Sequence, residues 1–185
     1  MKEIESIIAA CLKEQRNAQF MLYEHYAGLM FGICLRYTGN RTDAEDVMQD
    51  AFVKIFQNIK SFRQEGSFEG WMKRIMVNTA LNYLRTKKKA KFTELTPLMM
   101  NSPEENTDID YEVEPEILMK IIQKLPDGCR TVFNLYTFED YSHKEIATLL
   151  SFTEGTSKSQ LSRARKLLTE AVLEYKQKNN YQLAT

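Results

Sequence analysis

The sequence predicts an all-α protein built of two small helical bundles joined by a flexible acidic linker. Its 185 residues include only seven glycines and four prolines, fewer turn-forming residues than a strand-rich fold of this length needs. Apolar residues recur at steps of three and four, and no segment keeps the alternating period of a strand. Charge is uneven: residues 71–93 hold seven Lys or Arg and no acid, whereas residues 94–116 hold eight Asp or Glu and no base. We therefore expect one domain at residues 1–92, the linker at 93–114 and a second domain at 115–185.

Three long helices are expected in the first domain. The first ends at Gly39, where its apolar period stops. The second begins with Thr42 and Glu45, which have the three-apart spacing of a capping box. The third follows a glycine-containing loop and runs from Glu69 to about Lys88. The apolar residues expected to pack are Phe20, Tyr23, Tyr26, Met30, Ile33 and Tyr37 on the first helix, and Val47, Met48, Ala51, Phe52, Ile55, Phe56 and Ile59 on the second.

Four helices are expected in the second domain. Pro115 occupies a favoured first-turn position of the first helix, and the next helix opens after a Pro-Asp pair. Ser142 and Glu145 form a capping box at the start of the third helix. The last helix follows a short turn and runs from Glu154 to about Tyr175.

The last two helices have the pattern of a helix-turn-helix. Small Ala147 allows the helices to approach closely, and Phe152 fills their junction. The last helix is expected to bury Leu161, Ala164, Leu167 and Leu168 and to expose Thr156, Ser157, Lys158, Ser159, Gln160, Ser162, Arg163, Arg165 and Lys166. Hydroxyl and cationic side chains suit phosphate oxygens, and Gln160 can pair with an adenine edge. The alternative is an ordinary helical hairpin with a solvated basic face.

The helix around Trp71 has a polar face without an acid. Counted from Trp71, this face contains Arg74, Asn78, Asn82 and Arg85 at steps of three or four. Such a face suits unpaired DNA, because cations hold the backbone, amides bond base edges and an aromatic ring stacks or wedges. The preceding loop adds Phe62, Arg63 and Phe68. The alternative is that Trp71 anchors the core and the other side chains are merely solvated.

Other features exclude several classes of function. The three cysteines, Cys11, Cys34 and Cys129, are far apart and have no histidine nearby in the sequence, so we expect buried thiols in a reducing compartment. Acids flank the short apolar patch at the N-terminus, so we do not expect this segment to act as a signal peptide. No apolar run is long enough to span a bilayer. No glycine-rich phosphate loop and no nucleophile with a nearby base occurs. We expect a cytoplasmic protein that is not an enzyme, does not insert directly into a membrane, and uses no cofactor, metal ion or small-molecule substrate.

Three blocks of the sequence resemble, in their order, one family. They read DAEDVMQDAFVKIF at residues 43–56, SFRQEGSFEGWMKRIMVNTALNYLR at 61–85, and LPDGCRTVFNLYTFEDYSHKEIATLLSFTEGTSKSQLSRARKLL at 125–168. They resemble the core-polymerase-binding helix, the promoter −10 melting region and the −35 reader of the extracytoplasmic-function (ECF, group 4) sigma factors of the sigma-70 family. The resemblance implies a bacterial sigma factor that directs core RNA polymerase to promoters and helps to open the −10 element.

The resemblance also implies roles for individual residues. Contacts with the clamp helices of the largest polymerase subunit are implied for Asp43, Glu45, Asp46, Gln49, Asp50, Val53 and Phe56. Contacts with the −10 element are implied for Phe62, Arg63, Phe68, Trp71, Arg74, Asn78, Asn82 and Arg85, with Asn78 near a flipped base. Contacts with the −35 element are implied for Ser157, Lys158, Ser159, Gln160, Arg163 and Arg165. For Asp43 and Glu45, a solvated helix face with a capping carboxylate is the alternative.

Three residues depart from the family pattern. Gln160 stands where the family usually has Arg, and Ser157 replaces the usual Val. Both put the −35 sequence in doubt, because Arg prefers guanine and Gln prefers adenine. Ser151 stands where Gly commonly serves the turn, at a position where a left-handed backbone would favour glycine.

The charge balance bears on how the protein reaches DNA. The formal net charge is zero, and non-specific affinity for DNA rises with the number of phosphates neutralised. The resemblance implies that core polymerase, bound through its clamp helices and flap, supplies most of the grip on promoter DNA. It also implies an anti-sigma factor as a partner, and a linker that either enters a polymerase channel or is a solubilising spacer. The competing hypothesis is a free-standing helix-turn-helix regulator with an N-terminal helical sensor domain, which requires an apolar pocket and a dimer interface.

Overall fold

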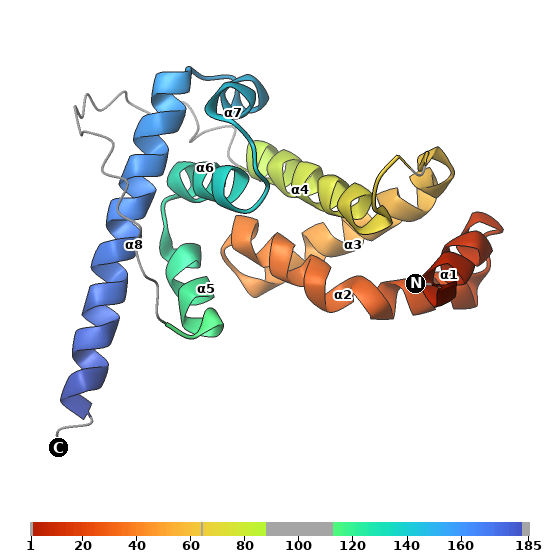
Figure 1. Ribbon diagram of the computed structural model, residues 1–185, viewed down its shortest axis with the longest axis horizontal. Coiled ribbons are helices and arrows are strands. Elements are labelled where there is room, and N and C mark those ends of the chain that lie inside the picture. The colour runs from red at the N-terminus through yellow and green to blue at the C-terminus, as the bar shows by residue number, and fades with distance from the viewer. Residues whose placement is uncertain (1, 64, 88–112, 183–185) are drawn as a thin grey trace. The chain divides into compact units, whose positions relative to one another are not determined.

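The computed structural model describes residues 2–63, 65–87 and 113–182. Within these residues every regular element is a helix, so the expected all-α fold is confirmed. Figure 1 shows the helices in chain order, coloured from red at the N-terminus to blue at the C-terminus.

The chain divides into two compact units, Met1–Lys88 and Lys89–Thr185. Of the linker expected at residues 93–114, only residues 113 and 114 belong to the described part of the chain.

The first unit is a three-helix bundle with an additional N-terminal helix. Its elements are α1 (Lys2–Leu12), α2 (Arg16–Thr38), α3 (Arg41–Asn58), the 3-10 helix η1 (Ile59–Ser61) and α4 (Phe68–Lys87). Helices α2, α3 and α4 pack against one another, and α1 packs on α2 and η1. The bounds of α2 and α4 agree with expectation to within a residue or two.

The core of the first unit corrects the expected inner face of α2. Phe20 was expected to pack, but its side chain is 61% exposed, whereas Leu22 is fully buried. Apolar residues surround α2 on every side, so more than one apolar stripe fits its sequence. The stripe that the structure buries begins with Ala18 and Leu22 and joins the expected one at Tyr26. On α3 the expected stripe is correct, except that Phe56 is only half-buried.

The turn between α2 and α3 confirms one expected signal and corrects another. Gly39 ends α2 with a left-handed backbone, at φ 81°, a conformation that glycine adopts without strain. The N-cap of α3 is Asn40 instead of Thr42: the Asn40 side chain accepts a hydrogen bond from the backbone N–H of Asp43 at 2.9 Å. Glu45 therefore does not take part in a capping box, and its carboxylate pairs with Arg41 at 2.7 Å. Both three-residue spacings fit the sequence, and the structure uses the earlier one.

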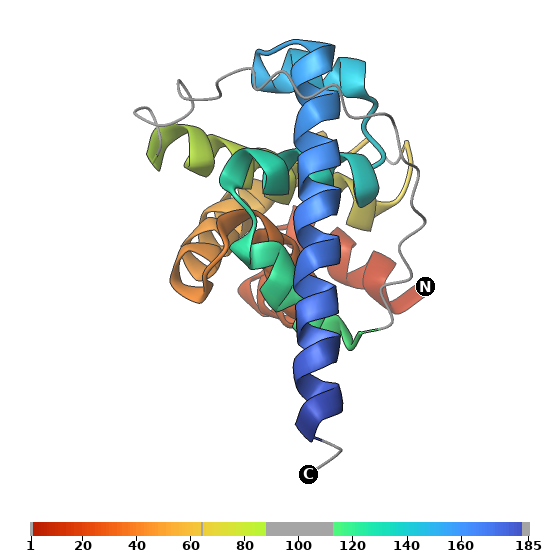
Figure 2. The same ribbon diagram turned by 90° about the vertical axis from the view of Figure 1, so that its left-hand side faces the viewer.

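The second unit packs three shorter helices along one long helix. Its elements are α5 (Pro115–Lys124), α6 (Asp127–Thr137), α7 (His143–Leu150) and α8 (Glu154–Gln182). Helix α8, which Figure 2 shows in blue along its full length, contacts each of the other three. Fully buried Leu135, Ile146 and Leu168 bring α6, α7 and α8 together.

A buried arginine of α6 holds the connection between α5 and α6 through hydrogen bonds. Arg130 is 4% exposed, and its guanidinium donates to the carbonyls of Gln123 and Leu125, each at 2.9 Å. It also pairs with Asp127. These bonds satisfy the buried charge and compensate carbonyls at the C-terminus of α5.

The helix-turn-helix is framed by two local signals that the sequence predicts. Ser142 and Glu145 form the expected capping box at the start of α7. At the end of α7, Ser151 has φ 59° and ψ 46°, the left-handed conformation expected from the glycine that the family places there.

Replacing Ser151 with glycine is expected to raise the free energy of unfolding by about 0.5 kcal/mol. A left-handed backbone costs a residue with a Cβ about 1–2 kcal/mol, and the greater freedom of glycine in the unfolded chain offsets about 0.5–1 kcal/mol of the relief. Urea unfolding measures the difference. The matched variant Thr148→Gly, in the interior of α7, should be destabilised, and a loss of stability in Ser151→Gly would contradict the assignment of strain.

Candidate nucleic-acid and polymerase interfaces

An aromatic cluster forms the base of the face expected to meet the −10 element. Phe62 precedes α4, and its ring centroid lies 5.1 Å from that of Phe68 and 5.7 Å from that of Trp71. Phe68 and Trp71 are 5.4 Å apart, and Phe68 also lies against Tyr26 of α2. Phe68 is buried, and Phe62 and Trp71 are half-buried. Trp71 is therefore partly a core anchor, as the alternative had it, and the cluster fixes the loop before α4 onto the bundle.

The expected polar face of α4 is exposed in the structure. Arg74, Asn78, Asn82 and Arg85 all face solvent, and the row from Arg74 to Arg85 extends about 16 Å along the helix. The guanidinium of Arg85 donates to the side-chain oxygen of Asn82 at 3.3 Å. Arg63, in the preceding loop, is also exposed. Lys73 lies beside this row and pairs with Glu69 at 2.7 Å.

The residues of α3 expected to bind polymerase fall into two groups. Asp46, Gln49, Asp50 and Val53 are exposed at steps of three and four, so they form one stripe on the outer face of the helix. We call these four residues the α3 stripe. Val53, an apolar residue, is 54% exposed in it. Phe56 lies half-buried at its end, with its ring 6.0 Å from that of Phe52.

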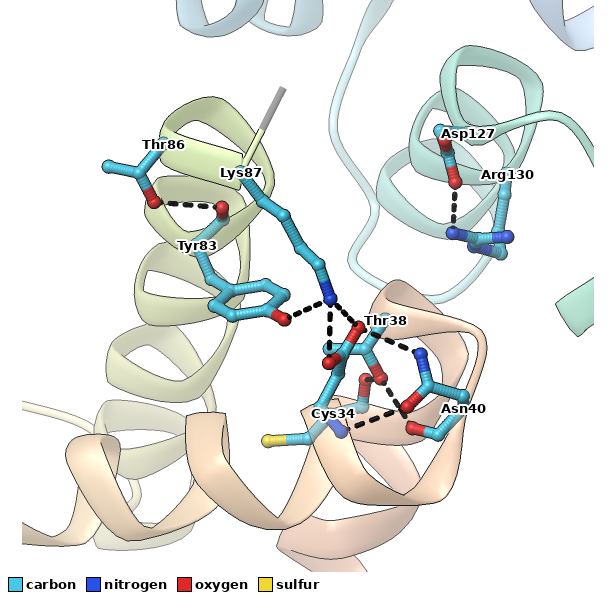
Figure 3. Close-up of polar contacts among 9 residues, drawn as sticks. Cys34, Thr38, Asn40, Tyr83, Thr86, Lys87, Asp127 and Arg130 are labelled. Carbon is cyan, nitrogen blue, oxygen red and sulfur yellow. Dashed lines mark hydrogen bonds and ion pairs between the residues drawn. The ribbon is translucent and has the colours of Figure 1, made fainter. Parts of the chain in front are cut away.

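The second group consists of Asp43 and Glu45, which form ion pairs with Lys87 and Arg41 of the same unit. Figure 3 shows Lys87 of α4 converging with Tyr83 on the start of α3 beside Asn40. The ammonium of Lys87 donates to both carboxylate oxygens of Asp43, at 2.8 and 2.6 Å, and to the Tyr83 hydroxyl at 2.7 Å. Asn40 donates to Asp43 at 2.7 Å, and the Asp43 side chain is 16% exposed. This network joins the N-terminus of α3 to the C-terminus of α4.

The network also determines the protonation of its members. Partial burial raises the pKa of the Asp43 carboxyl, but hydrogen bonds from Lys87, Tyr83 and Asn40 outweigh burial and lower this pKa to about 2. The hydrogen bond to Asp43 raises the pKa of Lys87. At neutral pH the pair is therefore fully ionised, and Asp43 is only partly exposed.

Replacing Asp43 with asparagine should lower the free energy of unfolding by about 1 kcal/mol at pH 7. The pKa of Asp43 lies below its ordinary value of 3.8, so its charge stabilises the fold above that pH, and the stabilisation is lost as the pH falls through about 2. Solvent screens the half-exposed Lys87, which keeps the effect small. Chemical unfolding at several pH values measures it. The matched variant Asp46→Asn, an exposed acid of the same helix, should change stability by less than about 0.5 kcal/mol, and equal losses in both variants would contradict the role of the network.

On α8, the side chains that face solvent differ in part from the expected set. Lys158, Ser162, Arg163 and Lys166 are exposed, and Ser159 is half-buried. The exposure of Ser162 and Lys166 confirms the expected outer face, although the family resemblance did not imply that they contact DNA. The four-residue step from Lys158 to Ser162 and Lys166 is the sequence signal that places them on the same face.

Two residues of the expected −35 set are engaged inside the second unit. Ser157 was expected on the outer face of α8, but it is 0% exposed, and its hydroxyl lies 2.8 Å from Nδ1 of His143. Its position continues the buried series of Leu161, Ala164 and Leu168, so the period of the helix turns it inward despite its polarity. Gln160 is half-buried, and its side-chain oxygen accepts from the thiol of Cys129 at 2.9 Å.

Arg165 belongs to a stacked group at the surface of the second unit. Its guanidinium carbon lies 5.8 Å from the centroid of the Tyr136 ring, which stacks on His143 with centroids 4.7 Å apart. Tyr136 is 36% exposed, with Arg165 and His143 against its ring.

Comparison with known proteins identifies the family. Residues 22–90 match the family described as Sigma-70 region 2, and residues 116–168 match Sigma-70, region 4. The ECF RNA polymerase sigma factor SigW of Bacillus subtilis is 30% identical over 177 residues, which cover 89% of this chain and 94% of SigW. The chain belongs to the ECF RNA polymerase sigma factors of the sigma-70 family. The ECF sigma-E factor of Haemophilus influenzae is 29% identical to this sigma factor over 180 residues, covering 91% of this chain and 94% of that protein.

A solved structure shares the fold of this sigma factor. A sigma factor from Bartonella quintana, crystallised in complex with an anti-sigma factor, aligns with a TM-score of 0.50 and 19% identity over 82% of this chain and 94% of that chain. The blocks at residues 43–56 and 61–85 lie in the region 2 match, and the block at 125–168 lies wholly in the region 4 match. Among the described residues, no helix of this sigma factor has the length and apolar character needed to cross a bilayer. No group of three or more His, Cys, Asp or Glu in that part of the chain is arranged to hold a metal ion.

Proposed function

We propose that this sigma factor recognises and opens the −10 element with α4 and reads the −35 element with α8, while α3 holds it on core polymerase. The observation that carries this proposal is the exposed, acid-free row of Arg74, Asn78, Asn82 and Arg85. The alternative, a free-standing helix-turn-helix regulator, assigns no function to this row. Because the chain belongs to the sigma-70 family, that alternative is no longer needed.

Opening the −10 element requires a base to leave the stack, which costs a few kcal/mol. Cations of the row hold the backbone of the separated strand, and the amides of Asn78 and Asn82 supply hydrogen bonds that the extruded base lost. The ring contacts of Phe62 with Phe68 and Trp71 hold the residue that precedes Arg63, so this part of the site is pre-organised. A rigid site loses less conformational entropy on binding.

Binding to core polymerase is assigned to the α3 stripe. Two carboxylates and an amide surround the exposed apolar Val53, a combination that suits a basic helix pair such as the clamp helices, because charge gives specificity and an apolar centre gives affinity. Asp43 and Glu45 take no part in this proposal, since each is already paired within the unit. The second unit is assigned to the polymerase flap.

Reading of the −35 element is assigned to the solvent-facing side of α8. Lys158, Arg163 and Lys166 contact phosphates or guanine edges, and Ser159 and Ser162 add short hydrogen bonds. Arg165 is placed at the edge of this surface by Tyr136. An anti-sigma factor is the proposed regulator, and the cytoplasm, where polymerase works, is the proposed location.

Run-off transcription with core polymerase of the same organism, on a library of genomic promoter fragments, tests this function. We expect a restricted set of start sites that depends on added sigma factor, and loss of those starts in Asn78→Ala and Arg163→Ala. Absence of any sigma-dependent start would refute the assignment.

A further inference from the structure

We propose that Ser157 and Gln160, two positions at which this chain departs from the family pattern, anchor the recognition helix α8 instead of reading DNA. This inference rests on the proposed −35 function of α8. The two anchor bonds are those between His143 and Ser157 and between Cys129 and Gln160. Ser157 and Gln160 are thus positioning residues for the side chains that do face DNA.

The first anchor bond joins the starts of the two helices of the helix-turn-helix. His143 is the first residue of α7, and Ser157 lies in the first turn of α8. Nδ1 of His143 and the Ser157 hydroxyl are 2.8 Å apart, and Ser157 is completely buried. A fully buried hydroxyl cannot reach a phosphate or a base without movement of the helix. The bond instead fixes the rotation of α8 directly beside Lys158.

The ring of His143 is itself held in place. It stacks on Tyr136 of α6 with an angle of 25° between the ring planes, and Arg165 lies over the Tyr136 ring. The group therefore connects the end of α6, the start of α7 and two positions on α8 that lie about two turns apart. Because each contact restrains a different element, the group orients α8 relative to the rest of the unit.

The second anchor bond connects α8 with α6. The Cys129 thiol is buried and donates to the side-chain oxygen of Gln160 at 2.9 Å. Burial raises the pKa of this thiol and outweighs the opposing effect of the nearby Arg163 charge. The sulfur therefore keeps its proton and can act as the donor. Recognition of adenine by glutamine needs the amide oxygen and nitrogen together. The bond to Cys129 directs the oxygen of Gln160 toward α6, so a two-point contact with adenine would require the side chain to leave this bond.

The two anchors have a common consequence for promoter recognition. They turn Ser157 and Gln160 toward α7 and α6, and they leave Lys158, Ser162 and Arg163 on the solvent side of the same helix. Loss of an anchor should therefore weaken every −35 contact together, whereas loss of a base-reading side chain should change the preference at one base pair.

Transcription by reconstituted holoenzyme on a promoter library randomised at the −35 element distinguishes these outcomes. We expect Gln160→Ala and Cys129→Ala each to lower transcription about threefold to tenfold for every −35 sequence, with base preferences unchanged. The double variant should be no weaker than the single variants, and Cys129→Ser, which keeps a donor, should retain activity. Arg163→Ala is the control that should change preference. A change of preference at one base pair in Gln160→Ala, absent from Cys129→Ala, would overturn the proposal.

The histidine anchor is tested with the same library. Ser157→Val removes the hydroxyl next to Nδ1 of His143, and we expect a uniform loss of −35-dependent transcription. The double variant His143→Phe/Ser157→Val replaces both polar partners and should recover most of the activity, since replacing both partners is far less costly than leaving one unpaired. Because preferences are ratios within one preparation, they do not depend on the folded fraction. A variant Ser157→Val that is fully active, or a double variant weaker than both single ones, would contradict the anchor.

Unfolding of the full chain provides a measurement that needs no polymerase. In a double-mutant cycle, Cys129→Ala and Gln160→Ala should be non-additive, and so should His143→Phe and Ser157→Val. Additive losses would overturn the anchors even if transcription were normal. If wild-type holoenzyme gave no transcript while the cycles showed coupling, the anchors would stand and the proposed function would fail.

Discussion

Replacing Asn78 with alanine is expected to slow promoter opening by core polymerase and this sigma factor about tenfold to a hundredfold. Asn78 lies exposed in the middle of the α4 row, where its amide can bond the edge of an extruded base. Removing a buried hydrogen-bonding partner costs about 1–3 kcal/mol, and each 1.4 kcal/mol at the transition state corresponds to about a tenfold change in rate. Folding should be unaffected, because Asn78 is not part of the core.

Permanganate oxidation of unpaired thymines at the −10 element measures this opening directly. Asn17→Ala, which removes an exposed asparagine of α2, is the matched control and should open promoters normally. A promoter with a pre-melted −10 element should recover part of the activity of Asn78→Ala, because unstacking has been done in advance. Normal opening by Asn78→Ala, or an equal defect in the control, would contradict the proposed role of α4 in opening the −10 element.

Reversing the charge of Asp46 and Asp50 together is expected to weaken binding to core polymerase about a hundredfold. Both carboxylates are exposed on the α3 stripe beside Val53. Each lysine replaces an attraction to the polymerase surface with a repulsion. Like charges that face each other across an interface weaken the free energy of binding by several kcal/mol. The defect should be larger at low ionic strength, because salt screens exposed charges.

Competition for core polymerase against labelled wild-type sigma factor measures the affinity. The double variant Glu170→Lys/Glu174→Lys makes the same change of charge at the same spacing on α8, with both acids exposed. It should compete almost as well as wild type. Equal weakening in the two double variants would show that overall charge, and not the α3 stripe, determines binding.

Local signals were sufficient to predict most helix starts and ends from α2 onward, but they did not predict α1 (Lys2–Leu12) or the continuation of α8 beyond Tyr175 to Gln182. Gly39 ends α2, Pro115 begins α5 and Ser142 caps α7. Each of these effects depends only on residues that are close in the sequence. The exposed row on α4 follows from helical period alone. The choice of Asn40 over Thr42 as the cap of α3 could not be predicted, because both have a suitable acid three residues later.

The partners of two site residues within the protein could not be predicted. The family resemblance implied a polymerase contact for Asp43, and polarity suggested that Ser157 faces solvent. Their partners, Lys87 and His143, are 44 and 14 residues away, and a sequence does not reveal pairs of this kind. For Ser157 the four-residue step to Leu161 was a usable signal, since position on a helix outweighs polarity when a buried partner is present.

The measurement that most directly tests the account is promoter binding by this protein with and without core polymerase. A chain with a formal net charge of zero neutralises few phosphates and should hold DNA weakly by itself. In an electrophoretic mobility-shift titration at physiological salt, we predict that the isolated protein binds a selected promoter at least about a hundredfold more weakly than the holoenzyme does. Binding of equal strength by the isolated protein would contradict the account.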